Sequence, residues 1–376
     1  MPKILQIGMG WFGEQPGALN RMYAGLLRGL ADCGAPVRGL VAGNPHNEAA
    51  APPALSFFES PDAPVIKRLS ACRRCVGAEL NANPADVVAA HFALYALPVL
   101  DLLRERRFVF HFHGPWACES RAEGENGLGT VVKSGVESFV YRRADRFITL
   151  SSAFAQILSQ GFGIARERIF VVPGGVDAER YAVAHTRGEA REQLGLPADR
   201  PLVLAVRRLA QHAGLEGLID AMSEVRRHAP EVLLLIAGGG ALAHELSVRI
   251  GERELQDHVR LLGFVGDDEL PLLYRACDLS IVPSVTLEGF GLSTIESLAA
   301  GTPVLVSPIG GLSETVAALD PALVLPDGSV PAMAAALVRA FGSLGSLPAP
   351  EACARYAREQ FDWPVIARKV LAVYEH

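Results

Sequence analysis

The segment from Leu279 to Gly311 constrains the fold of this chain more than any other stretch of its sequence. Its pattern predicts four consecutive elements, namely an apolar strand (279–283), a loop bracketed by glycines (288–291), a helix (292–300) and a second apolar strand (304–306). Gly301 and Pro303 are residues that commonly end a helix. The helix N-terminus points out of the predicted sheet, where its free backbone N–H groups and partial positive charge favour binding of an anion.

Two glutamates flank this predicted anion site. Glu288 lies in the glycine loop, and Glu296 lies eight positions later inside the helix. Carboxylates accept hydrogen bonds from hydroxyl groups, whereas the helix N-terminus attracts phosphate. The combination predicts a ligand with phosphate at one end and hydroxyls at the others, as in a nucleotide sugar. The alternative, that both glutamates only stabilise the helix end, does not explain the glycines, which let a backbone approach a ligand closely.

Length and composition favour a two-domain globular protein. The chain has 376 residues, half of them apolar, and a formal net charge of -6, which weighs against nucleic-acid binding. Of its six cysteines, Cys72 and Cys75 form a single C-x-x-C pair without a nearby histidine, so we expect reduced thiols and no zinc site. The N-terminus shows no signal-peptide pattern, and no window of 18 apolar residues occurs. We therefore expect a cytoplasmic protein.

Apolar strands alternate with helices along both halves of the chain, which predicts an α/β fold with parallel, doubly wound sheets. Helices are expected over 65–82 and 96–104, and irregular segments over 44–64, 114–129 and 173–201, the last with one short helix near 189–194. The last of these is expected to connect two similar halves. Ligands of open parallel sheets bind at the carboxyl ends of the strands, so the cleft between the halves is the expected site.

A G-x-G-x-x-G pattern from Gly8 to Gly13 suggests, taken alone, a dinucleotide-binding oxidoreductase. In that fingerprint the helix opens on the glycines, but here residues 14–17 separate them from the helix predicted at 18–33. The second strand also ends at Asn44, without the acidic residue that would bind a ribose. We therefore interpret the glycines as a loop that allows a ligand to approach the backbone.

The sequence EGFGLSTIE at 288–296, followed by AAGTPV at 299–304, resembles the signature of the family 4 retaining glycosyltransferases. The resemblance extends over nearly the whole chain, and it is supported by VPGGVD at 172–177, GGG at 238–240, LGFV at 262–265, HFHGPW at 111–116 and FDW at 361–363. It implies the GT-B fold, with two Rossmann-like α/β/α domains whose parallel sheets face a central cleft. By this resemblance residues 1–180 form the acceptor-side domain, 181–360 the nucleotide-sugar domain, and 361–376 a helix that crosses back to the first domain.

The resemblance also implies roles for individual residues. Glu296 would hold the ribose hydroxyls, Glu288 the hydroxyls of the donor sugar, and His113 would line the reacting face of that sugar. Further donor contacts are expected from the glycine loop, from the loop that meets the base and from the first domain, at Gly289, Phe290, Gly291, Leu292, Val265, Gly17 and Arg21. His111 shares a strand face with His113, so the sequence leaves open which of the two reaches the ligand, although we favour His113.

The segment VRRLAQHAG at 206–214 departs from the family pattern. The family typically has Gly-Arg-Leu here and a lysine just before the last glycine. Arg207 replaces the first glycine, Arg208 matches the arginine, and Ala213 replaces the lysine that normally neutralises the diphosphate. We therefore expect Arg208 to be catalytic and either Arg207 or His212 to supply the missing positive charge, since an arginine can bind phosphate through two hydrogen bonds.

A helix N-terminus and one or two cations can stabilise a departing diphosphate, and no Asp-x-Asp pair ends a strand. The sequence therefore predicts a metal-independent reaction with the nucleotide sugar as co-substrate and no cofactor. The favoured function is transfer of a sugar to a hydroxyl acceptor in glycan or glycoconjugate biosynthesis. The alternatives are a non-catalytic or weakly active nucleotide-sugar-binding protein of this fold and, less strongly, an epimerase.

The acceptor is not specified by the sequence, and a sugar, a lipid-linked sugar and a small molecule all remain open. The segment 116–129 is either a lid on the acceptor side or a solvated excursion. The basic segment 67–74 is either a solvated helix face or a peripheral contact with the inner membrane face. The base and sugar of the donor are also left open.

Overall fold

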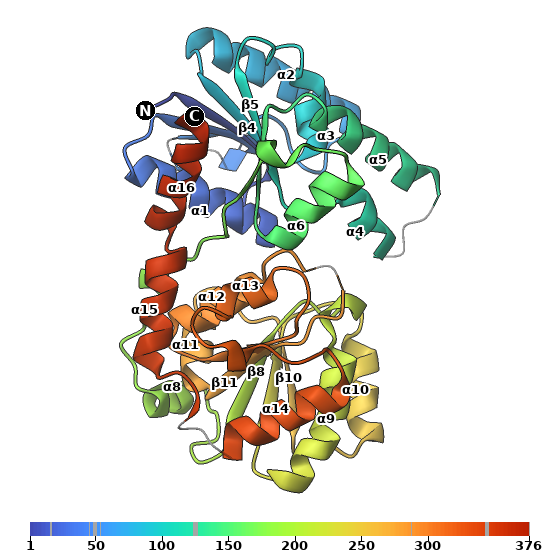
Figure 1. Cartoon of the computed structure of the whole chain (residues 1–376), viewed down its shortest axis with the longest axis vertical. Helices are drawn as coiled ribbons and strands as arrows, with labels where there is room; N and C mark the ends of the chain where they lie inside the picture. The colour runs from blue at the N-terminus through green and yellow to red at the C-terminus, as the bar shows by residue number, and fades with distance from the viewer. Residues whose placement is uncertain are drawn as a thin grey trace. The chain divides into compact units, whose positions relative to one another are not determined.

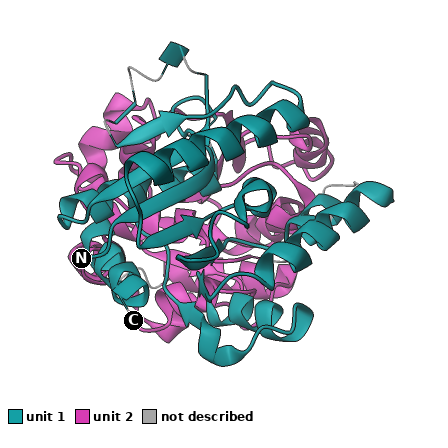
Figure 2. Cartoon of the chain, turned by 90° about the horizontal axis from the view of Figure 1, so that it is seen from above, with its two compact units in different colours: residues 1–175, 363–376 teal, residues 176–362 magenta. Residues whose placement is uncertain are grey.

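The computed structural model describes residues 1–15, 17–44, 46–47, 51–52, 54–122, 127–286, 288–342 and 346–375, without the side chain of residue 122. The chain forms two compact units. One comprises residues 1–175 together with 363–376, and the other comprises residues 176–362 (Figure 2). Each unit is an α/β structure built on one parallel sheet, as the alternation of apolar strands and helices predicts.

The sheet of the first unit has seven strands in the order β3-β2-β1-β4-β5-β6-β7, all parallel. Their bounds are β1 (Ile4–Gly10), β2 (Val37–Ala42), β3 (Leu55–Phe57), β4 (Val87–Ala90), β5 (Arg107–Phe112), β6 (Arg146–Thr149) and β7 (Ile169–Val171). The central strands are buried on both faces, which explains why they read as continuous apolar runs in the sequence. The order reverses between β1 and β4.

Helices cover both faces of this first sheet. They are α1 (Ala18–Asp32), α2 (Val65–Ala82), α3 (Ala93–Ala96), α4 (Trp116–Ala122), α5 (Leu128–Tyr141), α6 (Ser152–Gln156) and α16 (Trp363–Glu375). Because β–α–β crossovers are right-handed, α1 lies on one face, and the helices that follow β3, β4, β5 and β6 lie on the other. The last helix, α16, packs beside α1, so the two ends of the chain meet in the same unit (Figure 1).

The second unit has five parallel strands in the order β10-β9-β8-β11-β12. They are β8 (Leu202–Val206), β9 (Leu233–Ala237), β10 (Val259–Gly263), β11 (Leu279–Val282) and β12 (Val304–Val306). The helices are α7 (Ala178–Tyr181), α8 (Arg187–Gln193), α9 (Leu215–His228), α10 (Ala243–Glu252), α11 (Leu270–Ala276), α12 (Leu292–Ala299), α13 (Leu312–Val316), α14 (Val330–Gly342) and α15 (Pro350–Phe361). Helix α9 packs with α10 and α14, whereas α11 packs with α8, and α12 with α15 (Figure 1). The order reverses between β8 and β11.

Three segments of the first unit differ from the sequence-based prediction. The segment 44–64, predicted to be irregular, contains the edge strand β3, whose buried–exposed alternation spans only three residues and is too short to stand out in a sequence. The predicted helix 96–104 is instead α3 followed by a 3₁₀ turn that ends at Val99. The predicted loop 114–129 contains α4 and the start of α5, and its residues 123–126 lie outside the described part of the chain.

The segment 173–201, predicted to connect the two halves, is mostly an integral part of the second unit. Helix α8 lies within it, and its buried Ala190 packs against Leu272 and Ala276 of α11. Arg191 is also buried, and its guanidinium forms an ion pair with Asp278 at 2.7 Å. The glycines and prolines of this segment therefore mark turns between short helices that belong to a packed layer.

The indole of Trp363, at the start of α16, fixes how this helix packs in the first unit. It lies against Gly25 of α1 and against Gly175. A Cβ added to Gly25 would lie 2.1 Å from Cε2 of the indole, and one added to Gly175 would lie 2.5 Å from Cε3. A Cβ added to Gly29, also on α1, would lie 3.0 Å from the backbone oxygen of Trp363. The absence of side chains at these positions is therefore required for α16 to reach α1.

We predict that Gly25→Ala lowers the free energy of unfolding by about 1–3 kcal/mol, because the new methyl group overpacks the contact with the indole. Gly77→Ala is the matched control. Gly77 also lies inside a helix, but its added Cβ would meet nothing closer than 3.8 Å, so this variant should gain about 0.5–1 kcal/mol. Urea denaturation of both variants measures the difference. Equal stabilities would contradict this account of the α1–α16 contact.

Candidate active site

In each sheet, the polar side chains of the candidate site lie where the strand order reverses. In the second unit these side chains follow β8 and β11, and in the first unit they lie on or follow β1, β4 and β5. The loops after two such strands turn to opposite faces, which leaves an open crevice at the carboxyl ends of the strands.

The glycine loop after β11 folds back on the segment after β12. The N–H of Gly311 donates a hydrogen bond to the carbonyl oxygen of Glu288 at 3.0 Å. Gly310 has φ of 58°, and a Cβ there would lie 1.8 Å from the same oxygen. Gly291, the residue before α12, also has a positive φ, 77°. Glycine is needed at both positions because an L side chain would be strained and, at Gly310, would also clash with backbone.

The N-terminus of α12 has unused hydrogen-bond donors. No side chain caps this eight-residue helix. Within the part of the chain that the structure describes, the N–H groups of Leu292 and Ser293 have no acceptor. Such groups require an acceptor from outside the helix, and a phosphate supplies several. The side chain of Phe290 is buried in a contact with Phe361, with ring centroids 5.8 Å apart, so this residue can meet a ligand only through its backbone.

Glu288 is held by two neighbours rather than left free in the loop. Its Oε2 accepts hydrogen bonds from the guanidinium of Arg207 at 2.8 Å and from the hydroxyl of Ser284 at 3.0 Å. The same guanidinium nitrogen also donates to Ser284 at 2.8 Å. The side chains of Arg207 and Glu288 are only 11% and 18% exposed. Arg207 therefore orients Glu288. Because this carboxylate balances most of the positive charge of Arg207, little of that charge remains to attract a phosphate.

The position of the missing lysine is closed to solvent. Ala213 is fully buried at the end of a 3₁₀ turn. The next residue, Gly214, has φ of 73°, and a Cβ there would lie 1.9 Å from the carbonyl oxygen of Pro283. His212, one of the two predicted substitutes, is partly buried, and its carbonyl oxygen accepts the N–H of Val285. Arg208, by contrast, is exposed after β8, which leaves it as the cation of this segment most accessible to a ligand.

The remaining predicted donor contacts of the second unit differ in exposure. Glu296 is nearly buried in α12, and its Oε2 accepts a hydrogen bond from the hydroxyl of Tyr274 at 3.2 Å. Val265 lies partly exposed in the loop after β10, next to the exposed Phe264. Gly289 and Leu292 are also partly exposed. The hydroxyl of Tyr274 therefore holds one carboxylate oxygen of Glu296 in place.

A chain of hydrogen bonds links three histidines of the first unit to the C-terminal helix. Nε2 of His113 lies 2.9 Å from Nδ1 of His91, and Nε2 of His91 lies 2.7 Å from Oε1 of Gln6. The amide nitrogen of Gln6 donates to the hydroxyl of Tyr374 at 2.9 Å, and this hydroxyl lies 2.6 Å from Nε2 of His111. His111 is thus buried against α16, whereas His113 is partly exposed, which favours His113 as the histidine that reaches a ligand.

The chain of partners determines where the protons lie. Since Oε1 of Gln6 can only accept, Nε2 of His91 carries a proton and Nδ1 of His91 accepts the proton of Nε2 in His113. Nδ1 of His113 is then left as an acceptor for a ligand hydroxyl. Burial lowers the pKa of His113 from 6.5 to about 4 and lowers the pKa of His91 and His111 well below 6.5. This cluster therefore provides a neutral hydrogen-bond acceptor near pH 7.

The same three imidazoles place their nitrogens within 4.8 Å of one another, as the ligands of a metal would. Their rings, however, are nearly parallel. His91 and His111 are stacked with centroids 4.2 Å apart and 14° between the ring planes. A metal ion lies close to the plane of each imidazole that binds it, so an ion in the plane of one ring would lie above the other. In this arrangement the cluster suits hydrogen bonding rather than shared coordination.

The glycine-rich loop after β1 does not form a dinucleotide site. Helix α1 begins at Ala18, five residues after Gly13, which confirms the reason for rejecting the fingerprint. Gly17 precedes the helix and is exposed, and Arg21, one turn further, lies over the ring of Phe12 at 4.6 Å. The carboxylate of Glu14 accepts the N–H of Asn44 at 2.9 Å, so the end of β2 is bound to the loop.

Comparison with known proteins identifies the family. Residues 19–180 match the model of the family described as Glycosyltransferase Family 4, and residues 186–360 match that of Glycosyl transferases group 1. Glycogen synthase of Mycobacterium tuberculosis is 32% identical over 296 residues, which cover 77% of this chain and 68% of that protein. The chain belongs to the family 4 glycosyltransferases. This membership confirms the resemblance inferred from the segment 288–304.

Other relatives of this glycosyltransferase match over shorter regions. Mannosylfructose-phosphate synthase of Agrobacterium fabrum is 31% identical over 255 residues, or 64% of this chain and 54% of that protein. The 2-deoxystreptamine glucosyltransferase of Streptomyces kanamyceticus is 31% identical over 246 residues, or 62% of each. The matched regions thus span little more than half the length of these curated relatives.

Solved structures confirm the predicted GT-B fold. Sucrose-phosphate synthase from Thermosynechococcus elongatus has a TM-score of 0.82 at 23% identity, with 100% of this chain and 98% of that chain covered. HepE of Anabaena in complex with UDP-glucose has a TM-score of 0.78 at 20% identity, with both chains fully covered. At these identities the likeness establishes the fold of the glycosyltransferase and not its substrates. Within the described residues, no helix is long and apolar enough to span a bilayer.

Sequence reasoning did not find Gln6, His91 and Tyr374. A signal exists for His91, because it directly follows a predicted strand (87–90), and β4 lies beside β5, the strand that carries His111 and ends before His113. This signal can be used only when the strand order is known, and the sequence pattern does not contain it. Tyr374 has no such signal, since only the packing of α16 in the first unit brings it to a residue 368 positions away.

The neutral histidines predict a pH-dependent stability. Between pH 6.5 and about 4 the unfolded chain binds protons on these imidazoles and the folded chain does not, so stability falls as the pH is lowered through this range. Each imidazole contributes a slope of about 1.4 kcal/mol per pH unit. We expect His113→Gln to reduce the slope by about this amount, as measured by urea denaturation at several pH values. The exposed His185→Gln is the control, and the proposal of a neutral His113 is wrong if both variants have the parent slope.

Proposed function

We propose that this glycosyltransferase moves a sugar from a nucleotide-sugar donor to a hydroxyl acceptor with retention of configuration and without a metal ion. The observation that carries the proposal is the uncapped N-terminus of α12 at the reversal between β8 and β11, with Glu288 and Glu296 at its two sides. Free amides suit the diphosphate, and the two carboxylates suit hydroxyl groups. Retention is part of the proposal because the family signature at 288–296 implies it.

A nucleotide sugar is the donor that these groups fit. Glu296 would accept hydrogen bonds from the ribose, with Tyr274 holding its other oxygen. Glu288 would accept from the sugar, and Arg207 and Ser284 keep its carboxylate in place. Solved relatives of the same fold are complexes with UDP, with UDP-glucose or with ADP. This supports a nucleoside diphosphate leaving group without choosing the base.

Charge on the departing diphosphate would be met by amides and one exposed arginine. Arg207 is already paired with Glu288, so Arg208 and the N-terminus of α12 are the groups we assign to this role. Preorganised donors of this kind stabilise a transition state without rearranging when charge develops. His113, neutral and with Nδ1 as an acceptor, would instead bind a hydroxyl of the donor sugar. Its contribution is orientation of the sugar and not neutralisation of charge.

Donor binding is tested by thermal shift against a panel of nucleoside diphosphates and nucleotide sugars. A ligand that binds only the folded protein raises the melting temperature. Glu296→Gln should weaken binding of the best nucleotide by about tenfold to a hundredfold, because a hydrogen bond to a charged group contributes about 1.5–3 kcal/mol. Glu351→Gln, an exposed change on α15, is the control. A panel in which no nucleotide shifts the parent protein would refute the donor site.

Turnover separates an enzyme from a binding protein of the same fold. Donor hydrolysis or transfer should be measurable for the parent protein. Arg208→Ala should lower kcat by about a hundredfold or more, the usual loss when one charge-stabilising donor is removed, with a smaller effect on donor affinity. Arg355→Ala, also exposed, should leave kcat unchanged. If the parent protein binds nucleotide sugars but converts none with any acceptor tried, the alternative of a non-catalytic binding protein is correct.

A further inference from the structure

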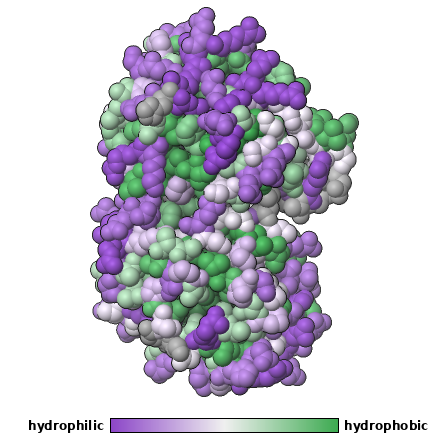
Figure 3. Space-filling view, viewed as in Figure 1, coloured by the Kyte–Doolittle hydropathy of each residue, from purple (hydrophilic) through white to green (hydrophobic). Residues whose placement is uncertain are grey.

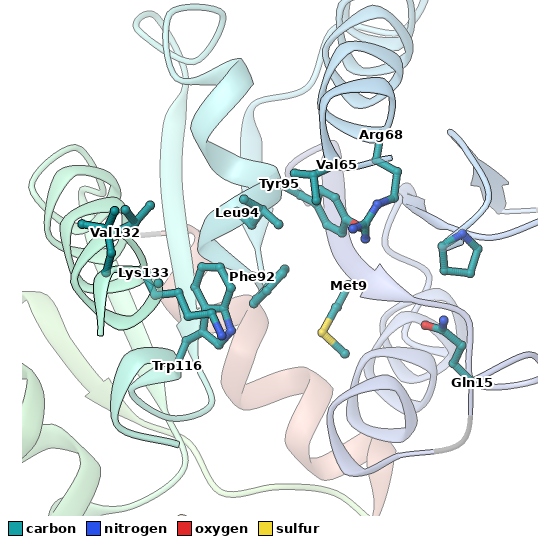
Figure 4. A pocket seen from close by; sticks show the side chains of 13 residues that line it. Met9, Gln15, Val65, Arg68, Phe92, Leu94, Tyr95, Trp116, Val132 and Lys133 are labelled. Carbon is teal, nitrogen blue, oxygen red and sulfur yellow. The ribbon is translucent and has the colours of Figure 1, made fainter. Parts of the chain in front are cut away.

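A pocket of about 640 Å³ opens in the first unit and has no assigned ligand. It lies at the carboxyl ends of β1, β4 and β5, between the start of α2 and the start of α5 (Figure 4). Its walls are mainly aromatic and aliphatic. The ring of Phe92 lies between those of Trp116 and Tyr95, with centroids 4.9 and 5.7 Å away, and Met9 and Leu94 complete the base. Pockets of this size and lining bind small apolar molecules.

Two cations stand on opposite walls of this apolar pocket (Figure 4). Arg68, from α2, donates to the hydroxyl of Tyr95 at 2.7 Å, and in the described part of the chain it forms no ion pair with a carboxylate. Lys133, from α5, lies over the ring of Trp116 at 5.1 Å and donates to the hydroxyl of Ser120 at 2.7 Å. Cationic side chains that face an apolar space favour an apolar ligand that also carries an anionic group.

The pocket adjoins the histidine chain. Phe92 directly follows His91, and Trp116 comes three residues after His113. Both pairs lie where the strand order reverses between β1 and β4, next to β5. The pocket lining and the histidine chain are therefore built on the same strand ends, although His113 itself does not line the pocket. This position suits the acceptor of the proposed transfer reaction.

Exposed apolar side chains surround the mouth of the pocket. On α2, Val65 is 44% and Ile66 is 82% exposed, and on α5, Leu128 is 80% exposed and Val131 and Val132 are similarly uncovered. In the space-filling view, hydrophobic atoms gather at the far end of α5 (Figure 3). Clustered exposed apolar side chains mark a contact with another apolar body. A ligand chain that leaves the pocket across this rim would cover them.

We propose that the pocket binds the acceptor as a lipid phosphate, an apolar chain joined through a phosphate to the group that bears the reacting hydroxyl. The inference rests on the proposed transferase function and names its acceptor class. Arg68 binds the phosphate, and the aromatic lining and the rim hold the chain. In the transfer, the bond between the sugar's anomeric carbon and the donor phosphate oxygen breaks, and a bond to the acceptor oxygen forms. The hydroxyl proton leaves with the nucleoside diphosphate.

The test uses dodecyl phosphate below its micellar concentration, with dodecanol and inorganic phosphate as its two halves. Binding to the full chain is measured by isothermal titration calorimetry. We expect dodecyl phosphate to bind at least tenfold more tightly than either half. Arg68→Gln should weaken its binding at least tenfold. Arg73→Gln on the same helix, where the arginine is exposed and paired with Asp101, should leave binding unchanged.

Dodecyl phosphate should also inhibit transfer in competition with the acceptor and not with the donor. Equal binding of dodecanol and dodecyl phosphate, or equal effects of the two arginine variants, would overturn the phosphate assignment. Absence of binding by dodecyl phosphate would overturn the pocket assignment. A thermal-shift measurement of nucleotide binding by the same variants distinguishes failure of the acceptor inference from failure of the proposed function. If nucleotides shift the melting temperature and dodecyl phosphate does not bind, only the acceptor inference fails, and if no nucleotide binds, the proposed function fails first.

Discussion

The right-handedness of β–α–β crossovers determines where this molecule can place a site. In each sheet the strand order reverses once, so the loops after the two strands at the reversal turn to opposite faces. Neither helix layer covers the carboxyl ends of those strands. Arg207 and Glu288 follow β8 and β11 at one reversal, and His91 follows β4 at the other. Both constellations therefore result from topology, which is why the polar residues of distant segments meet.

The two constellations differ in their electrostatics. In the second unit, the charges of Arg207 and Glu288 compensate each other, so the proposed groups for attracting an anion are the amides of α12 and the exposed Arg208. In the first unit, burial keeps His91, His111 and His113 neutral. The N-terminus of α12 in the second unit thus suits an anion, whereas the histidine cluster of the first unit suits a hydroxyl group. A transferase that binds a charged donor and an alcohol needs both environments.

The pocket of the first unit is lined mainly by aromatic and aliphatic side chains. Its aromatic walls do not offer the hydrogen bonds that a polyol requires, and unpaired polar groups of such a ligand would be costly to bury. Under the proposed assignment, the cation Arg68 would favour an apolar ligand that carries an anionic group.

The layered fold and the glycine loop around Glu288 could be predicted from the sequence alone. Strand and helix periods are local, and the glycines around Glu288 are required by backbone geometry that a sequence displays directly. Short elements such as β3 and α4 escaped prediction because three to seven residues carry too little periodicity. Only the tertiary structure showed that Arg207 is paired with Glu288 and that Gln6 and Tyr374 set the proton positions of His91 and His113. These facts depend on contacts between residues far apart in the chain, and such contacts follow from strand order and helix packing, which no local pattern contains.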